Sequence, residues 1–594
     1  MNFQPNEVQR RARIASALLF LTFLFLAGSF FRTQILQHAR YVLRSEFNRL
    51  REVPIPAARG IVYDRHGAII AENIPGYTVS LFSPGPDSLR EALRRLAGTI
   101  ALPDDQIDAV VRKFRRNQNR PAVIFDDAPF TVVSVLEEHR VEFPGLIIQP
   151  TPKRFYPDGP VVAALSGYTG EINESELDSR TFAGYKPGQQ VGKSGVEREY
   201  ESRLHGRDGV RFVEVDSRGR VVREAGARQD LPPVSAPPLH TNVDLDLQRF
   251  IVGLFGDSLV GGAVALEPGS GAVLALHSAP SFDPNRFIGS IPVDYWRALN
   301  SDPRKPLYNK ALQGKYPPGS TWKLATAVIA LETKVATLDD RMSVPCMGGY
   351  QYGNRWFRCH KKEGHGSLTL AQAIEQSCDA YFYQLGLKIG LTNLVAGGVS
   401  LGAGARTEID LPSEMRSDFP TVPATAYFNR VAGPRGWSQG GEALNLAIGQ
   451  GRNAQTVLNM ARFYTALATD GAAARPRVAR GPPVRERLFR LDSAQLAGLR
   501  AALAGVVSRG TAAASRIEGL LLAGKTGTAQ NAQDPARDHA WFVGFAPAND
   551  PKIVVAVMLE FGGHGTRAAR IASKIIAHYL KAAPRQLLST EGDG

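Results

Sequence analysis

The sequence predicts a multidomain α+β protein with a single N-terminal transmembrane helix. Three observations support this prediction. The chain has 594 residues, enough for roughly two to four domains. An uncharged apolar run lies near the N-terminus, and a proline-rich stretch at 231–238 separates two segments of mixed helical and strand pattern. We expect an α+β domain before this stretch and a larger domain after it, built on an antiparallel β-sheet flanked by helices.

Composition narrows the classes of function. Hydrophobic residues make up 44% and charged residues 21% of the chain, which is typical of globular domains. The net charge is +14, but no block of Lys and Arg is interleaved with aromatic residues, so nucleic-acid binding is unsupported. The basic balance favours an anionic partner such as a membrane surface or an acidic polymer. Three cysteines are too few for a disulfide scaffold.

Residues 14–31 are the predicted transmembrane anchor. The run from Ile14 to Phe31 has no charged residue and, as a helix, would extend roughly 27 Å, close to the thickness of a bilayer core. Arginines within 1–13 favour a cytoplasmic tail there and export of everything that follows the helix. The alternative is a signal peptide cleaved near Ala27, but the apolar run is long for such a peptide.

Residues 32–230 have a mixed α+β pattern without a cofactor motif. The expected elements are helices at Ser88–Leu96 and Pro103–Asn117, strands at Val123–Phe125 and Leu146–Gln149, and hairpin turns at Asp64–Gly67 and Asp216–Gly219. The stiff proline-rich linker at 231–238 then marks the main domain boundary.

Residues 239–582 form the predicted main domain. The expected elements are a helix at Asp244–Gly253, a hairpin of Gly262–Leu266 and Ala272–Leu276, strands at Leu520–Ala523, Ala540–Phe545 and Ile553–Glu560, and a closing helix at Ala568–Leu580. An early hairpin, a helical middle and late strands indicate an antiparallel sheet flanked by helices. We expect the tail at 583–594 to be disordered.

Ser320 and Lys323 are the first candidate catalytic residues. Two prolines and Gly319 precede Ser320, and an almost entirely apolar run follows Lys323, which predicts a turn that leads into a buried helix. Spacing of i, i+3 brings both side chains to one helix face. A lysine in an apolar helix must be paired or lose its proton, and an amine beside a serine can activate it as a nucleophile. The alternative is an N-cap serine with a lysine that reaches solvent.

Two further motifs follow in order. Ser377-Cys378-Asp379 lies in a stretch that we expect to be helical from Leu370, and Lys525-Thr526-Gly527-Thr528 lies on a late strand. Gly527 would let a substrate backbone approach closely. Ser-x-x-Lys, Ser-x-Asp/Asn and Lys-Thr-Gly, in this order, are the signature of serine enzymes that react with penicillin. Each motif is weak alone, whereas the ordered set predicts a serine acyl-transfer site.

On these motifs the chain resembles the class B penicillin-binding proteins, most closely those of cell elongation. The resemblance covers about residues 1–580 and includes the anchor, Arg59-Gly60, Gly195-Val196-Glu197 and Gly449-Gln450-Gly451. It implies an elongated pedestal, or dimerisation-like interaction domain, at 32–230 and a transpeptidase domain of the serine β-lactamase-like fold at 239–582. It also implies a periplasmic D,D-transpeptidase of the inner membrane that cross-links peptidoglycan stem peptides, maintains rod shape and is acylated by β-lactams.

The resemblance also implies roles for the first two motifs. Ser320 would attack the carbonyl between two D-alanines, Lys323 would take its proton, and Ser377 would relay a proton to the leaving amine. Asp379 stands where many relatives have Asn. Its carboxylate would lie near Lys323 and favour the protonated lysine, which leaves the identity of the base open.

The third motif would bind the substrate. Lys525 would bring positive charge to the substrate carboxylate, Thr526 and Thr528 would hydrogen-bond it, and Gly527 would give it room. The backbone N–H groups of Ser320 and Thr528 would form the oxyanion hole. No cofactor is needed for this chemistry.

The three cysteines lie close together in the sequence, at Cys346, Cys359 and Cys378, with His365 between the last two. Three Cys and one His can bind Zn²⁺ tetrahedrally, although the short Cys-x2–4-Cys spacing is absent. Some elongation-type relatives carry zinc beside the second motif, so the resemblance implies a structural Zn²⁺ here, with His360 as a substitute ligand. A Cys346–Cys359 disulfide with a free Cys378 is the alternative.

The resemblance further implies partners: a SEDS-type (RodA-like) glycan polymerase, through the anchor and pedestal, and MreC-like elongation scaffold proteins. Three other functions remain open at this point. A septal transpeptidase would share the fold, but the Cys–His cluster and Asp379 argue against it. A β-lactamase or D,D-carboxypeptidase would not need the long anchored N-terminal segment. A catalytically weak membrane-tethered scaffold would not need Ser320, Lys323, Ser377 and Lys525.

Overall fold

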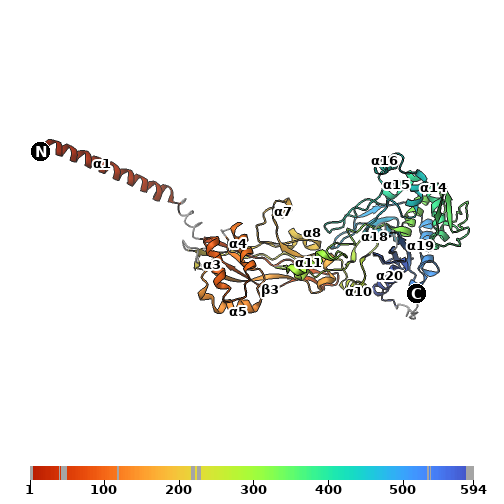
Figure 1. Ribbon diagram of the computed structural model, residues 1–594, viewed down its shortest axis with the longest axis horizontal. Coiled ribbons are helices and arrows are strands. Elements are labelled where there is room, and N and C mark those ends of the chain that lie inside the picture. Colours follow the sequence, from red (N-terminus) through yellow and green to blue (C-terminus); the bar gives the residue numbers. More distant parts are fainter. Residues whose placement is uncertain are drawn as a thin grey trace. The chain divides into compact units, whose positions relative to one another are not determined.

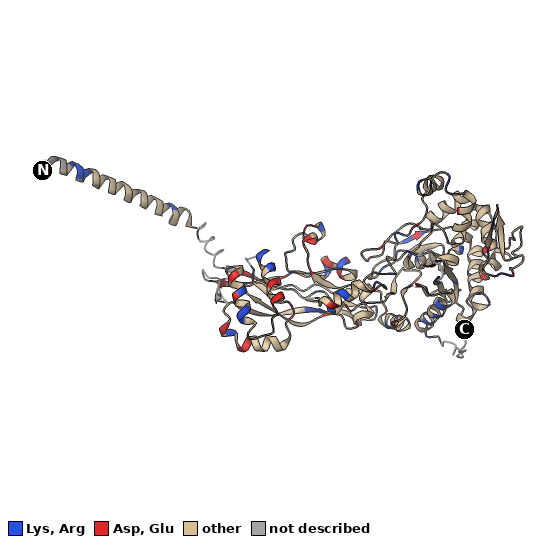
Figure 2. Ribbon diagram, in the orientation of Figure 1, with Lys and Arg blue, Asp and Glu red and all other residues tan. Residues whose placement is uncertain are grey.

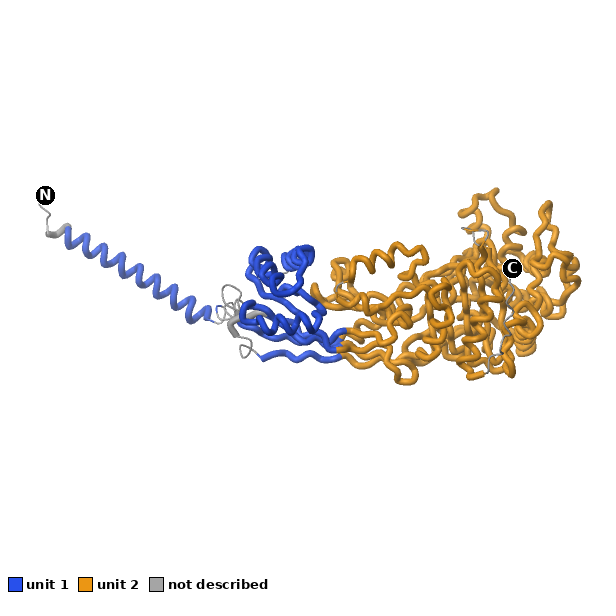
Figure 3. The backbone as a smooth tube through the Cα atoms, turned by 60° about the horizontal axis from the view of Figure 1, so that its bottom comes forward, with its two compact units in different colours: residues 1–58, 75–153, 206–235 blue, residues 59–74, 154–205, 236–594 orange. Residues whose placement is uncertain are grey.

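The chain folds into two compact units that interleave along the sequence. The computed structural model describes residues 5–38, 41, 50–116, 120–215, 221–223, 229–289, 291–530, 534 and 537–582. Unit 1 consists of residues 1–58, 75–153 and 206–235, and unit 2 of residues 59–74, 154–205 and 236–594 (Figure 3). The chain passes to unit 2 for the last time within the predicted linker. Two segments expected in the pedestal, 59–74 and 154–205, thus belong to the unit that contains the three motifs.

The predicted anchor is helical. α1 (Pro5–Phe31) continues into a π-helical turn (Arg32–Leu36), and among the described residues it is the one helix long and apolar enough to cross a membrane. Figure 2 shows charged residues near its ends and none along its middle. Its apolar side chains, Phe23 and Phe25 among them, are exposed, as expected of a helix whose solvent is lipid. The expected turn at 216–219 and tail at 583–594 lie outside the described residues.

Unit 1 packs amphipathic helices against short strands. Its elements after α1 are β1 (Leu50–Ile55), α3 (Pro86–Leu96), α4 (Asp104–Arg116), β4 (Ala122–Phe125), α5 (Phe130–Glu138), β8 (Gly209–Val215) and β9 (Val221–Arg223). Leu89, Leu93 and Leu96 recur at helical spacing on α3 and are buried. β1 pairs antiparallel with β8, and Val79–Leu81 pairs antiparallel with β4. The expected helices and the strand at Val123–Phe125 are confirmed, with ends that differ by one or two residues.

Two long strands contribute residues to both units: β3 (Ile69–Leu81) and β5 (Leu146–Phe155). The start of β3 belongs to unit 2 and pairs antiparallel with β2 (Val62–Tyr63) across the expected turn at Asp64–Gly67. The expected strand at Leu146–Gln149 is the first part of β5, which continues to Phe155.

A buried ionic network holds the early segments of unit 2 together. The Arg59 guanidinium lies 2.7 Å from Glu197 and 2.8 Å from Glu201, and Arg154 lies 2.6 Å from the other Glu197 oxygen. All four side chains are at most 7% exposed. Burial opposes ionisation of Glu201, but His205 and Arg59 outweigh it and lower the Glu201 pKa to about 2. The network therefore needs every member, because a single unpaired charge at this depth is costly.

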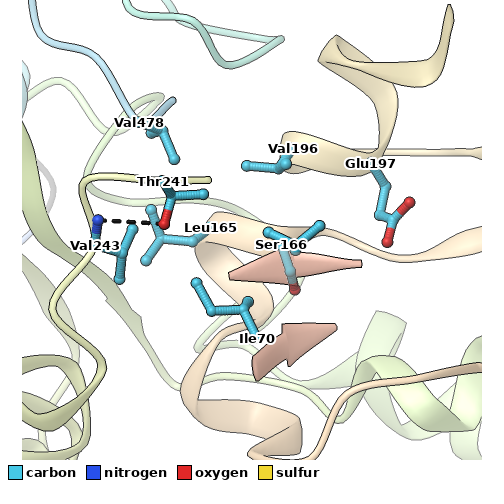
Figure 4. Close-up of a pocket in the computed structure, with 9 residues that line it drawn as sticks. Ile70, Leu165, Ser166, Val196, Glu197, Thr241, Val243 and Val478 are labelled. Atoms are coloured by element: carbon cyan, nitrogen blue, oxygen red, sulfur yellow. Dashed lines mark hydrogen bonds between the residues drawn. The ribbon is translucent and has the colours of Figure 1, made fainter. Parts of the chain in front are cut away.

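The early segments of unit 2 also share a hydrophobic core with its later part. Ile70, Leu165 and Val196 come from the early segments and meet Val243 and Val478 around a small cavity (Figure 4). All five are buried members of one hydrophobic cluster. The short elements here are α6 (Ala163–Ser166), β6 (Thr169–Glu171), α7 (Glu174–Leu177), β7 (Gln190–Gly192), α8 (Gly195–Glu199), α9 (Glu201–Leu204) and β10 (Leu239–His240).

A five-stranded antiparallel sheet forms the centre of unit 2. Its order is β12-β11-β19-β18-β17. The strands are β11 (Gly261–Leu266), β12 (Val273–Ala279), β17 (Ala523–Ala529), β18 (His539–Ala546) and β19 (Ile553–Leu559). Every residue of β11, β12, β18 and β19 is buried, so both faces of the sheet are covered. The antiparallel sheet is confirmed. The strand expected at Leu520–Ala523 is wrong in position, since β17 begins at Ala523 and carries the polar third motif.

Helices cover the sheet and extend beyond it (Figure 1). They are α10 (Leu245–Phe255), α11 (Val293–Ser301), α12 (Lys323–Glu332), α13 (Leu370–Glu375), α14 (Asp379–Ile389), α15 (Leu391–Ser400), α16 (Ala424–Ala432), α17 (Gln439–Ala447), α18 (Val457–Ala468), α19 (Ser493–Ser508) and α20 (Gly565–Tyr579). Two small hairpins complete the unit: β13 (Gly349–Tyr352) with β14 (Arg355–Arg358), and β15 (Ala472–Ala474) with β16 (Arg485–Arg487). α10, α18 and α20 pack directly on the sheet.

Candidate active site

The first motif forms the predicted turn and buried helix. Ser320 lies in a 3₁₀ turn (Gly319–Trp322) that leads directly into α12, where every residue from Lys323 to Leu331 is buried. Ser320 itself is partly exposed. The backbone carbonyl of Thr321 accepts a hydrogen bond from Tyr464 at 2.9 Å, which ties the turn to α18. A reachable hydroxyl thus precedes a fully buried amine by one helical turn.

Gly319 brings the turn against the third motif. Its φ is +53°, a conformation that favours glycine. A Cβ added at Gly319 would lie 2.7 Å from the carbonyl oxygen of Thr528, so a side chain there would collide with β17. The Gly319 N–H donates to the Gly449 carbonyl at 3.0 Å. The nucleophile turn and the Lys-Thr-Gly strand are therefore in direct backbone contact.

Lys323 connects the first and second motifs. Its Nζ lies 2.7 Å from the Ser377 carbonyl oxygen, 3.3 Å from Ser377 Oγ and 2.8 Å from Asp379 Oδ1. The ammonium can donate to all three acceptors. As an amine it can donate to two of them and keep a lone pair for a proton. The geometry suits a group that exchanges protons with a serine hydroxyl.

Asp379 is held from both of its oxygens. Oδ1 accepts from Lys323, and Oδ2 accepts from the backbone N–H of His360 at 3.1 Å, while the His360 ring Nδ1 lies 3.5 Å from Oδ2. Burial by itself would raise the pKa of Asp379, but the Lys323 charge and the His360 side chain outweigh it and lower the pKa below its usual range. In return, the bond to Asp379 is the main cause that raises the pKa of His360 to about 9. The carboxylate is thus ionised and fixed against Lys323.

Ser377 lies at a break between two helices, which corrects the expectation of a continuous helix from Leu370. α13 ends at Glu375 and α14 begins at Asp379. Ser377 has φ +55°, in the left-handed region that non-glycine residues seldom adopt. Such backbone strain concentrates at functional sites. The break turns both the carbonyl and the hydroxyl of Ser377 toward Lys323, which a regular helix would not do.

The third motif lies on β17 as predicted. Lys525 is fully buried, and burial together with the nearby Lys323 charge lowers its pKa well below the ordinary value. Gly527 approaches Pro318 and Thr321 so closely that a Cβ would lie 2.8 Å from the Pro318 carbonyl oxygen. The Thr528 hydroxyl accepts the Gly565 N–H at 3.2 Å and remains exposed. The strand therefore offers an open polar edge beside Ser320.

Thr511 is a site residue that sequence reasoning missed. Its hydroxyl lies 2.6 Å from the Thr526 hydroxyl, so one of the two donates to the other. Thr511 follows α19 in an ordinary Gly-Thr turn, and no local pattern distinguishes it. Its relation to Thr526 arises because α19 packs against β17.

Tyr316 and Glu560 are a second missed pair. The Tyr316 hydroxyl donates to Glu560 at 2.6 Å, and its backbone exchanges two hydrogen bonds with Gln455. The rings of His539 and Trp541 lie 5.3 and 6.4 Å from the Tyr316 ring. These residues anchor the chain just before the two prolines of the nucleophile turn. The rings of His539 and Trp541 thus help to hold Tyr316 in place.

The three cysteines and His365 form one cluster beside the second motif. Their potential ligand atoms all lie within 4.8 Å of one another. His365 Nδ1 lies 3.6 Å from Cys346 Sγ and 3.5 Å from Cys359 Sγ. All three cysteines are buried thiols, so the structure does not contain the alternative Cys346–Cys359 disulfide. Cys359, His360 and Asp379 form a second, smaller group of this kind.

The geometry supports nucleophilic acyl transfer. It combines a reachable serine, a buried lysine that touches a second serine, an ionised carboxylate, and a strand edge with a lysine and two threonines. A serine nucleophile with a nearby base and polar groups that can bind a carboxylate is the arrangement that forms an ester with a peptide-like carbonyl.

Comparison with known proteins agrees with this chemistry. Residues 261–577 match the family described as penicillin binding protein transpeptidase domain, and residues 54–233 match the penicillin-binding protein dimerisation domain. The peptidoglycan D,D-transpeptidase MrdA of Acinetobacter baumannii is 32% identical over 612 residues, covering 98% of this chain and 90% of that protein.

Solved structures are similar over almost the whole chain. Penicillin-binding protein 2 of Helicobacter pylori, in a complex with MreC, has a TM-score of 0.79 and 27% identity, covering 90% of this chain and 99% of that one. A chain from a structure titled as a peptidoglycan synthase complex that coordinates polymerization and crosslinking has a TM-score of 0.69 and 30% identity. That match covers 97% of this chain and 100% of the other.

Proposed function

The chain belongs to the penicillin-binding protein transpeptidase family, and we propose that it cross-links peptidoglycan during cell-wall elongation through an acyl-enzyme formed on Ser320. It is a serine-type D,D-transpeptidase. The observation that supports the residue roles best is the position of Lys323 between Ser377 and Asp379, one helical turn after Ser320.

Acylation begins at Ser320. Its Oγ attacks the carbonyl carbon between the two terminal D-alanines of a donor stem peptide. Its proton passes to Lys323 Nζ, which acts as the base in its amine form, after it has given up to solvent the proton that pairs it with Asp379 at rest. The C–N bond then breaks, and the proton returns through Ser377 to the nitrogen of the departing D-alanine. Asp379 stabilises the transient ammonium of Lys323 throughout. In the second half-reaction, an amine of an acceptor stem attacks the ester, and Ser320 recovers its proton.

The third motif binds the donor. The substrate carboxylate would lie beside Lys525 and accept hydrogen bonds from Thr526 and Thr528. Burial lowers the pKa of Lys525, and a substrate carboxylate beside it would raise that pKa and favour the charged form. The N–H groups of Ser320 and Thr528 would hold the oxyanion, since Gly319 keeps their backbones close.

Labelling with a fluorescent penicillin tests the nucleophile. The wild type should be labelled and Ser320→Ala should not, while Ser301→Ala, an exposed serine at the end of α11, should label like the wild type. Labelling of Ser320→Ala at the wild-type rate would contradict the assignment. The same assay separates a transpeptidase from a β-lactamase, because a transpeptidase stays acylated whereas a hydrolase turns the penicillin over.

The chain would be a single-pass protein of the bacterial inner membrane. The arginines before the apolar part of α1 favour a cytoplasmic N-terminus and a periplasmic remainder. Its partners would be an MreC-like scaffold and a RodA-like glycan polymerase of the SEDS type. Support comes from the relatives, one of which was solved with MreC and one in a peptidoglycan synthase complex. Replacing residues 14–31 by an unrelated apolar helix should weaken recovery of the polymerase, and unchanged recovery would contradict this contact.

We further propose that Cys346, Cys359, His365 and Cys378 bind one structural Zn²⁺. Three thiols and an imidazole are a donor set that zinc binds tetrahedrally. At ordinary bond lengths, zinc holds a sulfur and a nitrogen ligand about 3.6 Å apart, and His365 Nδ1 lies 3.6 and 3.5 Å from two of the sulfurs. The ion would fasten the chain on both sides of the β13–β14 hairpin to Cys378, next to Ser377. It takes no part in acyl transfer.

Metal analysis of protein purified without chelator tests the zinc site. We expect about one equivalent of zinc, and loss of zinc in Cys359→Ser. Less than about a tenth of an equivalent of zinc with two thiols missing would favour the disulfide instead. Trp296→Ala, a change at an exposed residue of α11, provides a control for purification.

A further inference from the structure

The β13–β14 hairpin is a part of unit 2 that the acyl-transfer chemistry does not use. In the sequence it begins shortly after Cys346, and Cys359 and His360 follow directly after its second strand. The His360 N–H bonds Asp379, and the Arg358 carbonyl accepts from the Tyr383 hydroxyl at 3.1 Å. The returning strand therefore ends two residues from a contact with the second motif.

The inner face of the hairpin fixes it to the helices behind that motif. Tyr350 pairs with Phe357 and Tyr352 with Arg355, so these four side chains share one face. The Phe357 ring lies 5.6 Å from the Tyr383 ring of α14. The Tyr352 hydroxyl lies where a side chain at Gly440, in the first turn of α17, would begin. Phe357 and Tyr352 therefore fix this face to α14 and α17, although Tyr352 and Arg355 are themselves exposed.

The outer face shows a different composition. Trp356 pairs with Gln351, and Arg358 pairs with Gly349, which lets the indole ring lie over the glycine. A Cβ at Gly349 would lie 2.6 Å from the indole. Trp356 is 48% exposed although it is a large aromatic residue. Gly349 thus makes room for a flat ring, about half of whose residue surface remains open to solvent.

Basic residues lie on both sides of Trp356 along the chain. Residues 349–363 contain the basic residues Arg355, Arg358, Lys361 and Lys362 and the acidic residue Glu363. The side chains of Arg358, Lys361 and Lys362 are exposed, and none has an ion-pair partner among the described residues. Exposed basic side chains without ion-pair partners, close in the sequence to an exposed aromatic ring, fit an anionic ligand with apolar faces.

We propose that the outer face of the β13–β14 hairpin binds the peptidoglycan strand beyond the reacting stem, with Trp356 under a sugar ring and Arg358, Lys361 and Lys362 facing stem-peptide carboxylates. The inference rests on the proposed function, because that function brings a polyanionic glycan strand to Ser320. Two observations favour this occupant. The basic side chains complement the carboxylates of the strand, and Arg358 is only two residues from His360, which contacts Asp379. The hairpin determines strand affinity rather than bond chemistry.

Binding of soluble, uncrosslinked peptidoglycan strands to the detergent-solubilised full chain tests the proposal. Trp356→Ala and the double variant Lys361→Gln/Lys362→Gln should each weaken strand binding about tenfold, equivalent to about 1.4 kcal/mol. Matched changes elsewhere should alter it less than twofold: Trp296→Ala, an exposed tryptophan of α11, and Lys574→Gln, an exposed lysine of α20. The loss in the double variant should shrink at high salt, since screening weakens the wild type most.

Acylation by a small fluorescent penicillin is measured in parallel on every variant. The loss of strand affinity in the hairpin variants should exceed any loss of acylation rate at least fivefold, and Trp356→Phe should recover part of the strand affinity. Equal losses would show that the hairpin only supports the fold. Unchanged strand affinity would overturn the proposal, and so would loss of polymerase or scaffold binding alone, which would identify a protein-docking surface. Failure of the wild type to be acylated would instead contradict the proposed function.

Discussion

The Nζ of Lys323 lies 2.8 Å from Oδ1 of Asp379, although 56 positions separate the two residues in the chain. The pair joins the start of α12 to the start of α14, and Ser377 is held between them. The carboxylate gives Lys323 a fixed counter-charge, which an amide cannot supply.

Asp379→Asn should lower the rate of acylation by a β-lactam about 10- to 100-fold. The substitution keeps the shape of the side chain but removes the charge that stabilises the Lys323 ammonium formed during attack by Ser320. Stopped-flow acylation with a fluorescent penicillin measures the rate. Asp294→Asn, at an exposed position of α11, should leave it unchanged. A wild-type rate in Asp379→Asn would show that the counter-charge is dispensable.

Lys525→Met should abolish acylation and yet raise the free energy of unfolding by about 1–3 kcal/mol at pH 7. Burial and the Lys323 charge lower the pKa of Lys525, so the folded state binds the Lys525 proton less tightly than the unfolded state does. Wild-type stability therefore rises as the pH approaches the unfolded-state value, and the advantage of Met should shrink above about pH 9. Denaturant unfolding at several pH values measures both effects. A less stable variant at pH 7 would mean that Lys525 mainly supports the fold.

Thr511→Val should lower the efficiency of acylation about three- to tenfold, because Thr526 loses the hydroxyl that orients it. Thr511→Ser retains the hydroxyl and should recover most of the efficiency. Comparing kcat and KM for a chromogenic thioester substrate would locate the loss in binding. Wild-type efficiency in Thr511→Val together with a loss in Thr511→Ser would mean that the methyl group matters and the hydrogen bond does not.

Glu201→Gln should change how stability depends on acid. The pKa of Glu201 is about 2 in the folded protein, from an ordinary value of 4.5. A lowered folded-state pKa contributes stability above the unfolded-state value, and this contribution is lost as the pH falls from about 4.5 to 2. The wild type should therefore lose about 3 kcal/mol more than Glu201→Gln across that window. Parallel unfolding curves at each pH check this. The exposed Glu137→Gln should follow the wild type.

The sequence predicts those features that depend on local pattern. The turn before Ser320, the buried helix after it, the strand that carries Lys525 and the antiparallel sheet all have periodicity or chain-breaking residues that reveal them. The order of the three motifs then predicts that they meet.

Other features depend on contacts distant in sequence and have no local signature. We expected Ser377 within a helix, because its neighbours are good helix formers. In the structure the helix is broken there, where Ser377 has a positive φ and its carbonyl accepts a hydrogen bond from Lys323. Thr511 and Glu560 reach the site only because α19 and β19 pack there. In the sequence they look like any other polar residues. We expected the main boundary at a single linker, because a proline-rich stretch can be seen in the sequence. The sequence has no pattern that shows the chain passing several times between the two units.

The interleaving of the two units limits how related genes can exchange parts. The core of unit 2 brings Ile70, Leu165 and Val196 against Val243 and Val478, residues encoded on opposite sides of the 206–235 segment (Figure 4). A single crossover near residue 236 would combine two halves of one core from different parents. Chimeras that carry segments 59–74 and 154–205 along with the C-terminal part should fold more often.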